Sequence, residues 1–202
     1  MIEISDELCQ LLNEGGVVAY PTSTLPGLGC LPTKMGLDNL FRIKNRSYDQ
    51  PVSLGVASLS QASELVNIPK FAISLLDDFP LGSITLILDA NDTLDSRLGG
   101  DRVAVRVFAD PVAKKLAEVV GPITATSANP SGVQPNNNVS LAAQTLNLRK
   151  ISILEGDCPG GKGSTILSLE KNSLEKGGFS VTIMREGVVP RADVMSWMMK
   201  VR

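Results

Sequence analysis

Short apolar runs rich in β-branched residues alternate with longer segments of mixed polarity along most of the chain. Such runs are typical of buried strands, because β-branched side chains pack well on a pleated surface. The runs that predict strands are "VVAYPT" (17–22), "VSLGVAS" (52–58), "SITLILDA" (83–90), "RVAVRVF" (102–108), "PITATS" (122–127), "ISILEG" (151–156), "STILSLE" (164–170) and "FSVTIMRE" (179–186).

The segments between these runs show the spacing and the capping residues of helices. Ser5 can cap a helix that continues to about Asn13, and Asp110 with Pro111 can open a helix that continues to Val120. Further helices are predicted near 36–45, 60–66, 70–79, 140–147 and 192–200. Strands alternate with helices in the first two thirds of the chain and then follow one another. This order predicts one α/β domain with a mixed sheet.

The composition fits a single packed domain. The chain has 202 residues, of which 43% are hydrophobic and 20% charged. Apolar runs of about eighteen residues are absent, and the start, "MIEISDELCQ", has neither a basic segment nor an apolar core. We therefore expect a cytoplasmic protein without a membrane span or a secretory leader. Cys9, Cys30 and Cys158 lie far apart, so buried free thiols are expected.

The absence of histidine narrows the possible chemistry more than any other count. It excludes Ser-His-Asp and Cys-His nucleophile systems, histidine metal sites and histidine general bases. Any reaction must depend on arginine, lysine, carboxylates, hydroxyls, backbone amides or a bound metal. The formal net charge of −2 argues against a general nucleic-acid binder, although a local basic pocket stays possible.

Four segments carry polar residues at or near strand ends: "PTSTLPGLG" (21–29), "RIKNR" (42–46), "RVAVR" (102–106) and "ITATSANPSG" (123–132). The hydroxyls of the first could simply cap a helix, and the cations of the second could simply face solvent. In the third segment, Arg102, Ala104 and Arg106 share one strand face. Arg106 lies in a β-branched strand, so it needs a partner, either an anionic ligand or a structural carboxylate.

One glycine-rich segment, "GDCPGGKGS" (156–164), comes close to a phosphate-binding P-loop. The P-loop requires Ser or Thr directly after the lysine and a helix directly after the loop. Here Gly163 follows Lys162, and the next residues favour a strand. We therefore predict an ordinary loop between two strands.

Taken together, the polar segments indicate a ligand that carries phosphates and a small polar part. Arginine and lysine bind phosphate oxygens, whereas hydroxyls and amides at strand ends bind sugars, base edges or carboxylates. Without histidine, such a site would act by positioning its reactants and by electrostatic stabilisation. Phosphoryl and nucleotidyl transfer can proceed in this way.

The motifs "PTSTLPGLG", "KNR", "GSITLIL", "VAVRV", "TSANPSG", "GST" and "REG" occur in the order and spacing of the YrdC-like family of threonylcarbamoyl-AMP synthases. The resemblance extends from about residue 10 to residue 188, and the pair "VAVR" and "TSANPSG" is its most specific part. It implies a single YrdC-like domain over 1–202, with a short C-terminal helix at 190–202. It also implies a twisted α/β fold around a wide, basic, concave cavity.

The same resemblance implies an activity and its partners. L-threonine, bicarbonate and ATP, with Mg²⁺ accompanying ATP and no organic cofactor, would give threonylcarbamoyl-AMP and pyrophosphate. The product would serve the modification of adenosine 37 in tRNA. The enzyme that transfers the threonylcarbamoyl group, tRNA and double-stranded RNA are the macromolecular partners that the resemblance suggests.

Site residues follow from the resemblance position by position, without a covalent nucleophile or a protein metal site. The residues expected to contact threonine or its carbamate are Thr24, Arg106, Ala125 and Ser164. The residues expected to contact ATP are Lys44, Arg46, Gln50, Arg102, Ser127, Asn129, Pro135 and Arg185.

The chain departs from the usual family pattern at a few positions. Ser23 replaces the usual glutamate, Pro26 a common tyrosine, and Gly55 a histidine that some members carry; near Gln50 a basic residue or asparagine is common. We expect these differences to gather on the amino-acid side of the cavity. Two rival functions stay open: a paralogue that binds RNA or a nucleotide without this activity, and a carbamoyltransferase domain that uses carbamoyl-adenylate.

Overall fold

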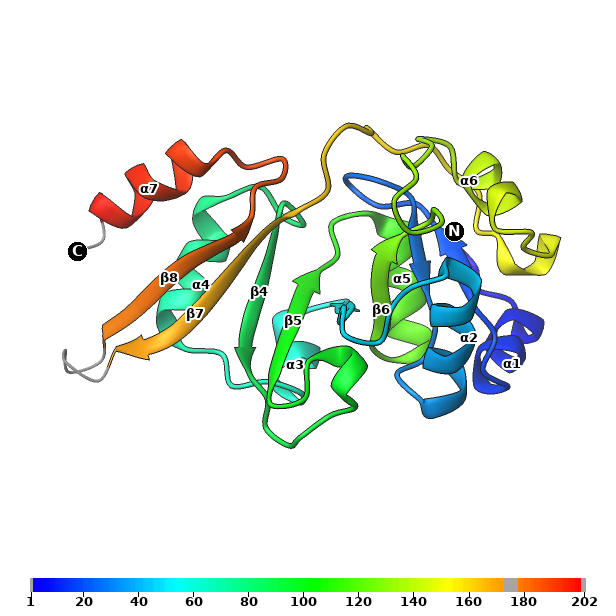
Figure 1. Cartoon of the computed structure of the whole chain (residues 1–202), viewed down its shortest axis with the longest axis horizontal. Helices are drawn as coiled ribbons and strands as arrows, with labels where there is room; N and C mark the ends of the chain where they lie inside the picture. Colours follow the sequence, from blue (N-terminus) through cyan, green and yellow to red (C-terminus); the bar gives the residue numbers. More distant parts are fainter. Residues whose placement is uncertain (1, 173–177, 201–202) are drawn as a thin grey trace.

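The computed structural model describes residues 2–172 and 178–200, and within them the chain forms one sheet flanked by helices (Figure 1). The strands are β1 (Val18–Tyr20), β2 (Gly27–Gly29), β3 (Ser53–Val56), β4 (Ile84–Asp89), β5 (Arg102–Val107), β6 (Ile123–Ser127), β7 (Thr165–Asn172) and β8 (Gly178–Arg185). The helices are α1 (Asp6–Asn13), α2 (Lys34–Lys44), α3 (Leu59–Ser63), α4 (Lys70–Asp78), α5 (Pro111–Val120), α6 (Val139–Thr145) and α7 (Arg191–Lys200), with 3₁₀ turns η1 (Ser96–Leu98) and η2 (Lys150–Ser152).

The sheet is mixed, as the order of elements predicted. Its strands lie in the order β1-β2-β6-β3-β5-β4-β7-β8. The pairs β3–β5 and β4–β7 are parallel, and the other neighbours are antiparallel. Strands distant in sequence therefore become neighbours, and the polar ends of β3, β5, β6 and β7 come together on one sheet.

Local capping residues explain where two of the helices begin. The Ser5 hydroxyl accepts a hydrogen bond from the Leu8 amide at 3.3 Å, which confirms the predicted start of α1. The Asp110 carboxylate accepts bonds from the first amides of α5, with Pro111 in the first turn, also as predicted. The predicted C-terminal helix is observed as α7 over Arg191–Lys200, and residues 201–202 lie outside the described part.

One predicted strand is absent, and one strand was not predicted. The run 151–156 does not form a strand: its start lies in η2, and only an isolated bridge between Ile153 and Ala19 follows. Ile153 and Leu154 are partly buried against the two apolar clusters, whereas Ile151 is exposed. Conversely, Gly27–Gly29, for which no strand was predicted, forms β2, which pairs with β1 and β6. The sequence did not predict this strand because two of its residues are glycines, which have low strand propensity.

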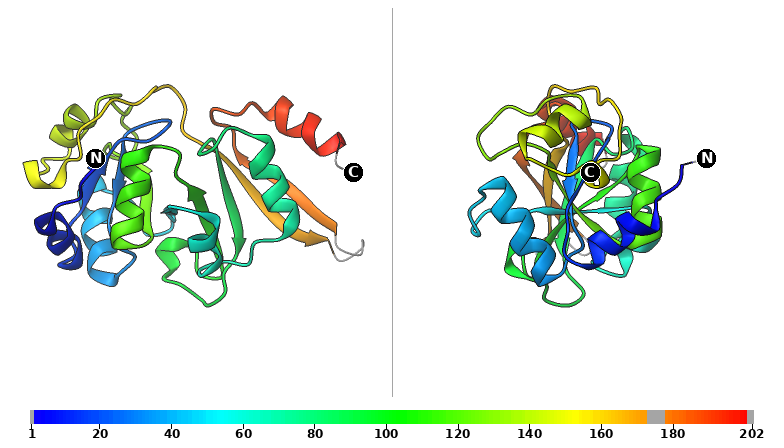
Figure 2. Two further views of the ribbon diagram at one scale, coloured as in Figure 1. Left: turned by 180° about the vertical axis from the view of Figure 1, so that it is seen from behind. Right: turned by 90° about the vertical axis from the view of Figure 1, so that its right-hand side faces the viewer.

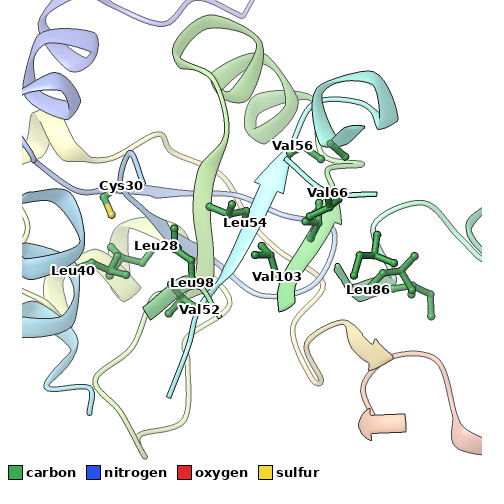
Figure 3. Close-up of a cluster of buried hydrophobic side chains, with 14 of the residues drawn as sticks. Leu28, Cys30, Leu40, Val52, Leu54, Val56, Val66, Leu86, Leu98 and Val103 are labelled. Atoms are coloured by element: carbon green, nitrogen blue, oxygen red, sulfur yellow. The ribbon is translucent and has the colours of Figure 1, made fainter. Parts of the chain in front are cut away.

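Alternation along the strands gives the sheet two different faces. One face carries the larger apolar cluster, which includes Leu54, Val103 and Leu86 and packs against α2, α3, α4, α6 and α7 (Figure 3). The opposite face carries a smaller cluster, in which Tyr20 and Phe108 pack against α1 and α5. The view from behind shows α5 in front of the strands, on the far side from α2 (Figure 2). Over β4, β5 and β7 this second face carries polar residues, and it supplies the walls of a cavity.

Gly55 lies on this second face and is required by a neighbouring aromatic ring. A Cβ atom at Gly55 would lie 1.9 Å from Cζ of Phe108, far inside van der Waals contact. Phe108 is 1% exposed, so its ring has little room to move away. The glycine thus makes space for the ring that covers β3.

Gly55→Ala should therefore lower the free energy of unfolding by about 1–3 kcal/mol, because the added methyl overpacks the core. Phe108→Ala should lower the free energy of unfolding less in the Gly55→Ala background than in the unmodified chain. In that background the substitution also removes the collision between the added methyl and the ring. Chemical denaturation of both single variants and the double variant measures this coupling. Strictly additive changes would contradict the assigned contact.

Candidate functional site

A cavity of about 720 Å³ lies over the second face of the sheet. Alternate residues of β5 and of the first part of β7 line it, namely Arg102, Ala104, Arg106, Ile166 and Ser168. The remaining walls come from the loop after β1, from β6 and from the segment that surrounds Ser164. The strand period of two thus separates an apolar face that packs the core from a polar face that lines the cavity.

Most of the residues expected to bind ligand lie on the cavity wall. Those that line it are Thr24, Arg46, Arg102, Arg106, Ala125, Ser127, Ser164 and Arg185. Those that do not are Lys44, Gln50, Asn129 and Pro135. Their roles toward a ligand stay predictions, but the geometry separates wall residues from residues behind or beside the wall.

Arg106 is buried at the end of the cavity formed by the loop after β1. Its Nε donates to the Gly82 carbonyl at 2.8 Å, and its Nη2 donates to the hydroxyls of Ser23 and Thr24 at 3.1 and 3.0 Å. Among the described residues it has no carboxylate partner. Burial is the largest influence on its pKa and lowers it, and the charge of Arg185 lowers it further against the opposing effect of Tyr20.

Arg46 and Arg185 are also held by neutral acceptors. Arg46 donates to the carbonyls of Gln50 and Pro51 at 2.7 and 3.0 Å, and Arg185 donates to the Ser164 carbonyl at 2.8 Å. Neither forms an ion pair within residues 2–172 and 178–200. Burial lowers the pKa of both guanidinium groups, and the charge of Arg185 also lowers that of Arg46. An anion placed between them would relieve this repulsion.

Two other cations on the wall already have acidic partners. Arg102 is paired with Asp89 at 2.5 Å and also donates to the Ser168 hydroxyl at 2.8 Å. Lys162 is paired with Glu186 at 3.0 Å. These pairs leave Arg46, Arg106 and Arg185 as the wall cations whose charge nothing in the described part neutralises. They are the groups best suited to bind phosphate or carboxylate.

Lys44 has a different position from its neighbour Arg46. It is 2% exposed, and its ammonium group donates to the carbonyl oxygens of Ser127 and Asn129, the latter at 2.7 Å. Its own carbonyl accepts a bond from the Ser131 amide at 2.9 Å. Lys44 thus holds the turn after β6 from behind, while the Ser127 side of that turn faces the cavity.

Asn129 folds the same turn. Its Nδ2 donates to the carbonyls of Pro130 and Val133, at 2.9 and 2.5 Å. Its Oδ1 is buried and has no hydrogen-bond partner among the described residues. The small polar residues of "TSANPSG" therefore have two different roles. Ser127 lines the cavity, and Asn129 holds the turn through its hydrogen bonds.

Several wall residues were not predicted from the sequence, among them Tyr20, Ser53 and Thr85. Tyr20 and Ser53 lie in apolar runs, and Thr85 lies within a strand predicted from its apolar residues. The Thr85 and Ser164 hydroxyls are 2.7 Å apart, and the Ser53 hydroxyl donates to the Ala125 carbonyl at 2.7 Å. The sequence signal that could have indicated them is a polar residue within an otherwise apolar strand, at a position that faces the cavity.

The departures from the usual family pattern differ in whether they line the cavity, and their position relative to a bound amino acid stays a prediction. Pro26 lines the cavity, and the Ser23 hydroxyl bonds Arg106. Gly55 does not line the cavity, because the Phe108 ring covers it. This last difference is accounted for by core packing.

The glycine-rich segment before β7 is not a P-loop, as predicted. Gly160 and Gly161 adopt positive φ angles of 80° and 78°, and a strand follows directly as β7. The Gly160 amide donates to the Thr24 carbonyl at 2.8 Å. The segment therefore joins the loop after β1 and closes one side of the cavity.

The described residues contain no group of three or more histidine, cysteine, aspartate or glutamate side chains that could hold a metal ion. In the same part of the chain, every helix is too short or too polar to cross a membrane.

The buried ammonium of Lys44 predicts a pH dependence of stability. Burial, with a smaller effect of Arg46, lowers the Lys44 pKa from 10.5 to about 8. Between these values the unfolded chain binds more protons than the folded one, so the free energy of unfolding should rise with pH, by about 3 kcal/mol at most. Urea denaturation of the unmodified chain and of Lys44→Met, at about pH 7.5 and about pH 10, measures it.

The rise should be absent in Lys44→Met and retained in Lys70→Met, which removes an exposed lysine of α4. Equal pH slopes for the unmodified chain and Lys44→Met would show that this ammonium is not the buried charge assigned here.

Comparison with known proteins identifies relatives of this architecture. The family model described as "Telomere recombination", that of the Sua5, YciO and YrdC proteins, matches residues 10–187. The threonylcarbamoyl-AMP synthase of Bacillus subtilis is 34% identical over 184 residues, which cover 83% of this chain and 53% of that protein. The threonylcarbamoyl-AMP synthase of Vibrio parahaemolyticus is 30% identical over 163 residues, which cover 77% of this chain and 88% of that protein.

A solved structure agrees with the sequence relatives. The crystal structure of Pyrococcus abyssi Sua5 complexed with L-threonine matches with a TM-score of 0.80 and 29% identity, over 93% of this chain and 55% of that one. The chain spans about half the length of the Bacillus protein and of the Pyrococcus structure, and most of the length of the Vibrio protein. Because the family model matches far more than half of its residues, the chain belongs to the family of the Sua5, YciO and YrdC proteins.

Proposed function

We propose that this protein is an L-threonylcarbamoyladenylate synthase, a nucleotidyltransferase that makes threonylcarbamoyl-AMP and pyrophosphate from L-threonine, bicarbonate and ATP. The observation that carries the proposal is the cavity wall on which Arg46, Arg106 and Arg185 converge without acidic partners in the described part. The names of the Bacillus and Vibrio relatives, and the threonine bound by the Pyrococcus protein, support the choice of reaction.

The cavity suits a ligand with a triphosphate and a small amino acid. Arg106, with the hydroxyls of Ser23 and Thr24 beside it, offers a site for the carboxylate or the carbamate of threonine. The charge of Arg185 lowers the pKa of Arg46, and the acceptors of both side chains in the described residues are backbone carbonyls, so phosphate oxygens would bind both. Ser127 lies on the wall contributed by β6, where it would orient the α-phosphate and the nucleoside.

The reaction needs no covalent intermediate on the protein. The neutral threonine nitrogen forms a bond to the carbon of carbon dioxide and releases a proton, or to that of bicarbonate with loss of water, and in either case a carbamate results. A carbamate oxygen then attacks the α-phosphorus of ATP in line, a new P–O bond forms, and the bond to pyrophosphate breaks. Positioning of two bound reactants can lower the barrier by roughly 7–11 kcal/mol at best, and arginines on the wall stabilise the negative charge of the leaving group.

Magnesium fits this scheme as a companion of ATP. The acidic side chain on the wall, Glu186, is paired with Lys162, and the described residues hold no cluster of acidic ligands. Phosphate oxygens and water would therefore provide most of its ligands, as is common for this ion. It would add to the neutralisation of the leaving phosphates. The transfer enzyme and tRNA remain proposed partners, and a role in modifying adenosine 37 follows from the proposed product.

Product identification tests the proposal. Incubation with L-threonine, bicarbonate and ATP should yield threonylcarbamoyl-AMP by mass spectrometry, in step with pyrophosphate release. Arg106→Ala should lose most of this activity and keep its fold, whereas Ser127→Ala should reduce the activity without abolishing it. ATP binding without any adenylate would favour the nucleotide-binding paralogue, and an adenylyl or carbamoyl group on the denatured chain would overturn the scheme.

Arg46→Ala should weaken ATP binding by about 1.5–3 kcal/mol, the amount typical of a lost charge-assisted hydrogen bond. Arg42→Ala is a matched control, because Arg42 carries the same charge on α2, is exposed and does not line the cavity. Titration calorimetry with ATP and magnesium compares the two variants. Equal affinities for Arg46→Ala and Arg42→Ala would remove Arg46 from the phosphate site.

A further inference from the structure

Two aromatic side chains form a wall beside Arg106, and we call Tyr20 and Phe108 together the aromatic wall. Tyr20 is fully buried, lines the cavity and belongs to the smaller apolar cluster with Phe108. The two rings meet edge to face, with centroids 5.6 Å apart and planes at 76°. The Tyr20 hydroxyl donates to the Thr124 carbonyl at 3.0 Å, which fixes the ring at its far end.

Glycines on the cavity face of two strands make room for these rings. A Cβ atom at Gly27 would lie 2.6 Å from Cε2 and Cζ of Tyr20, and one at Gly29 would lie 3.0 Å from Cε1. A Cβ atom at Gly55 would lie 1.9 Å from Cζ of Phe108. The Tyr20 ring thus lies flat on β2 and the Phe108 ring lies on β3, so neither can retreat toward the sheet.

Strand register places the aromatic wall next to the cation expected to bind the amino acid. Gly55 pairs with Arg106 of β5 on one side and with Ile123 of β6 on the other. Because the Phe108 ring covers Gly55, the ring lies between the side chains of these two neighbours. The effect of Tyr20 on the Arg106 pKa reflects the same proximity.

We propose that the aromatic wall is the specificity-determining element of the amino-acid end of the cavity, and that it limits the substrate to amino acids with small side chains. The inference rests on the proposed function, because it assumes that an amino acid binds at Arg106. A wall that is packed against the sheet on one side and pinned at the Tyr20 hydroxyl cannot yield to a larger side chain. Phe108 reaches the ligand only through Tyr20 and is therefore a positioning residue.

The test uses binding of free amino acids. Titration calorimetry with threonine and with leucine gives the ratio of their dissociation constants for the unmodified chain, for Phe108→Ala and for the milder Phe108→Leu. The unmodified chain should prefer threonine. Shortening Phe108 leaves room for the Tyr20 ring to move back, so the preference should fall at least about tenfold, within the range that pocket size contributes to specificity.

Leu116→Ala is the matched control. Leu116 is fully buried in the same apolar cluster, on α5, and does not line the cavity. It should lower stability and leave the threonine-to-leucine ratio unchanged, which separates loss of packing from loss of the wall. Should both Phe108 variants fail to fold, Gly55→Ala/Phe108→Leu provides the enlarged pocket with a partly refilled core.

The outcomes distinguish the two proposals. An unchanged ratio of the threonine and leucine dissociation constants in the folded Phe108 variants contradicts the proposed role of the aromatic wall, even where threonylcarbamoyl-AMP is formed. A ratio that shifts as expected supports the wall, even where no adenylate appears and the proposed function fails. Equal binding of threonine and leucine by the unmodified chain, or no binding of either, also overturns the wall.

Discussion

The guanidinium of Arg106 lies buried on β5, and the acceptors around it in the described structure are a carbonyl and two hydroxyls. A buried cation with neutral partners is costly, and its pKa is lowered by burial. Arg46 and Arg185 share this condition, and the charge of Arg185 acts on both of the others. The cavity is thus prepared for an anion that the described residues do not provide. This electrostatic constraint supports the proposed function, whose substrates carry a triphosphate and a carboxylate.

The sheet makes this constraint possible by keeping its faces distinct. Leu54, Val103 and Leu86 bury one face under five helices, which provides much of the apolar burial that stabilises the fold. The other face can therefore carry arginines and hydroxyls over β4, β5 and β7. At one end of that face, Tyr20 belongs both to the cavity lining and to the smaller apolar cluster, in which it packs against Phe108. Behind the wall of β6, Lys44 fixes the turn on which Ser127 lies.

Much of this fold could be predicted from the sequence, because most strands and caps carry strong local signals. The β-branched runs of β4 and β5 and the cap at Asp110 are clear examples. The β2 strand could not be predicted, because Gly27 and Gly29 have low strand propensity. Their close contact with the Tyr20 ring, which leaves no room for a side chain, is visible only in the folded sheet. The run 151–156 was misassigned because its apolar residues, of which Ile151 is exposed and Ile153 and Leu154 are partly buried, make only one isolated bridge to β1.

The site was also predictable in part, where a local sequence pattern indicates which residues share a strand face. Arg106 and Arg102 were found because a strand period of two places them on one face. Lys44 could not be separated from Arg46 by sequence, since the direction of each side chain depends on where α2 ends against the turn after β6. Thr85 and Tyr20 gave no polar cluster in sequence and reach the cavity only through strand register.

The most direct measurement for this account is titration calorimetry with inorganic pyrophosphate. The account predicts saturable binding at one site, weakened by salt and lost in the double variant Arg46→Ala/Arg185→Ala. Binding of the same strength in the double variant, or no binding by the unmodified chain, would contradict the claim that unneutralised arginines make this cavity an anion site.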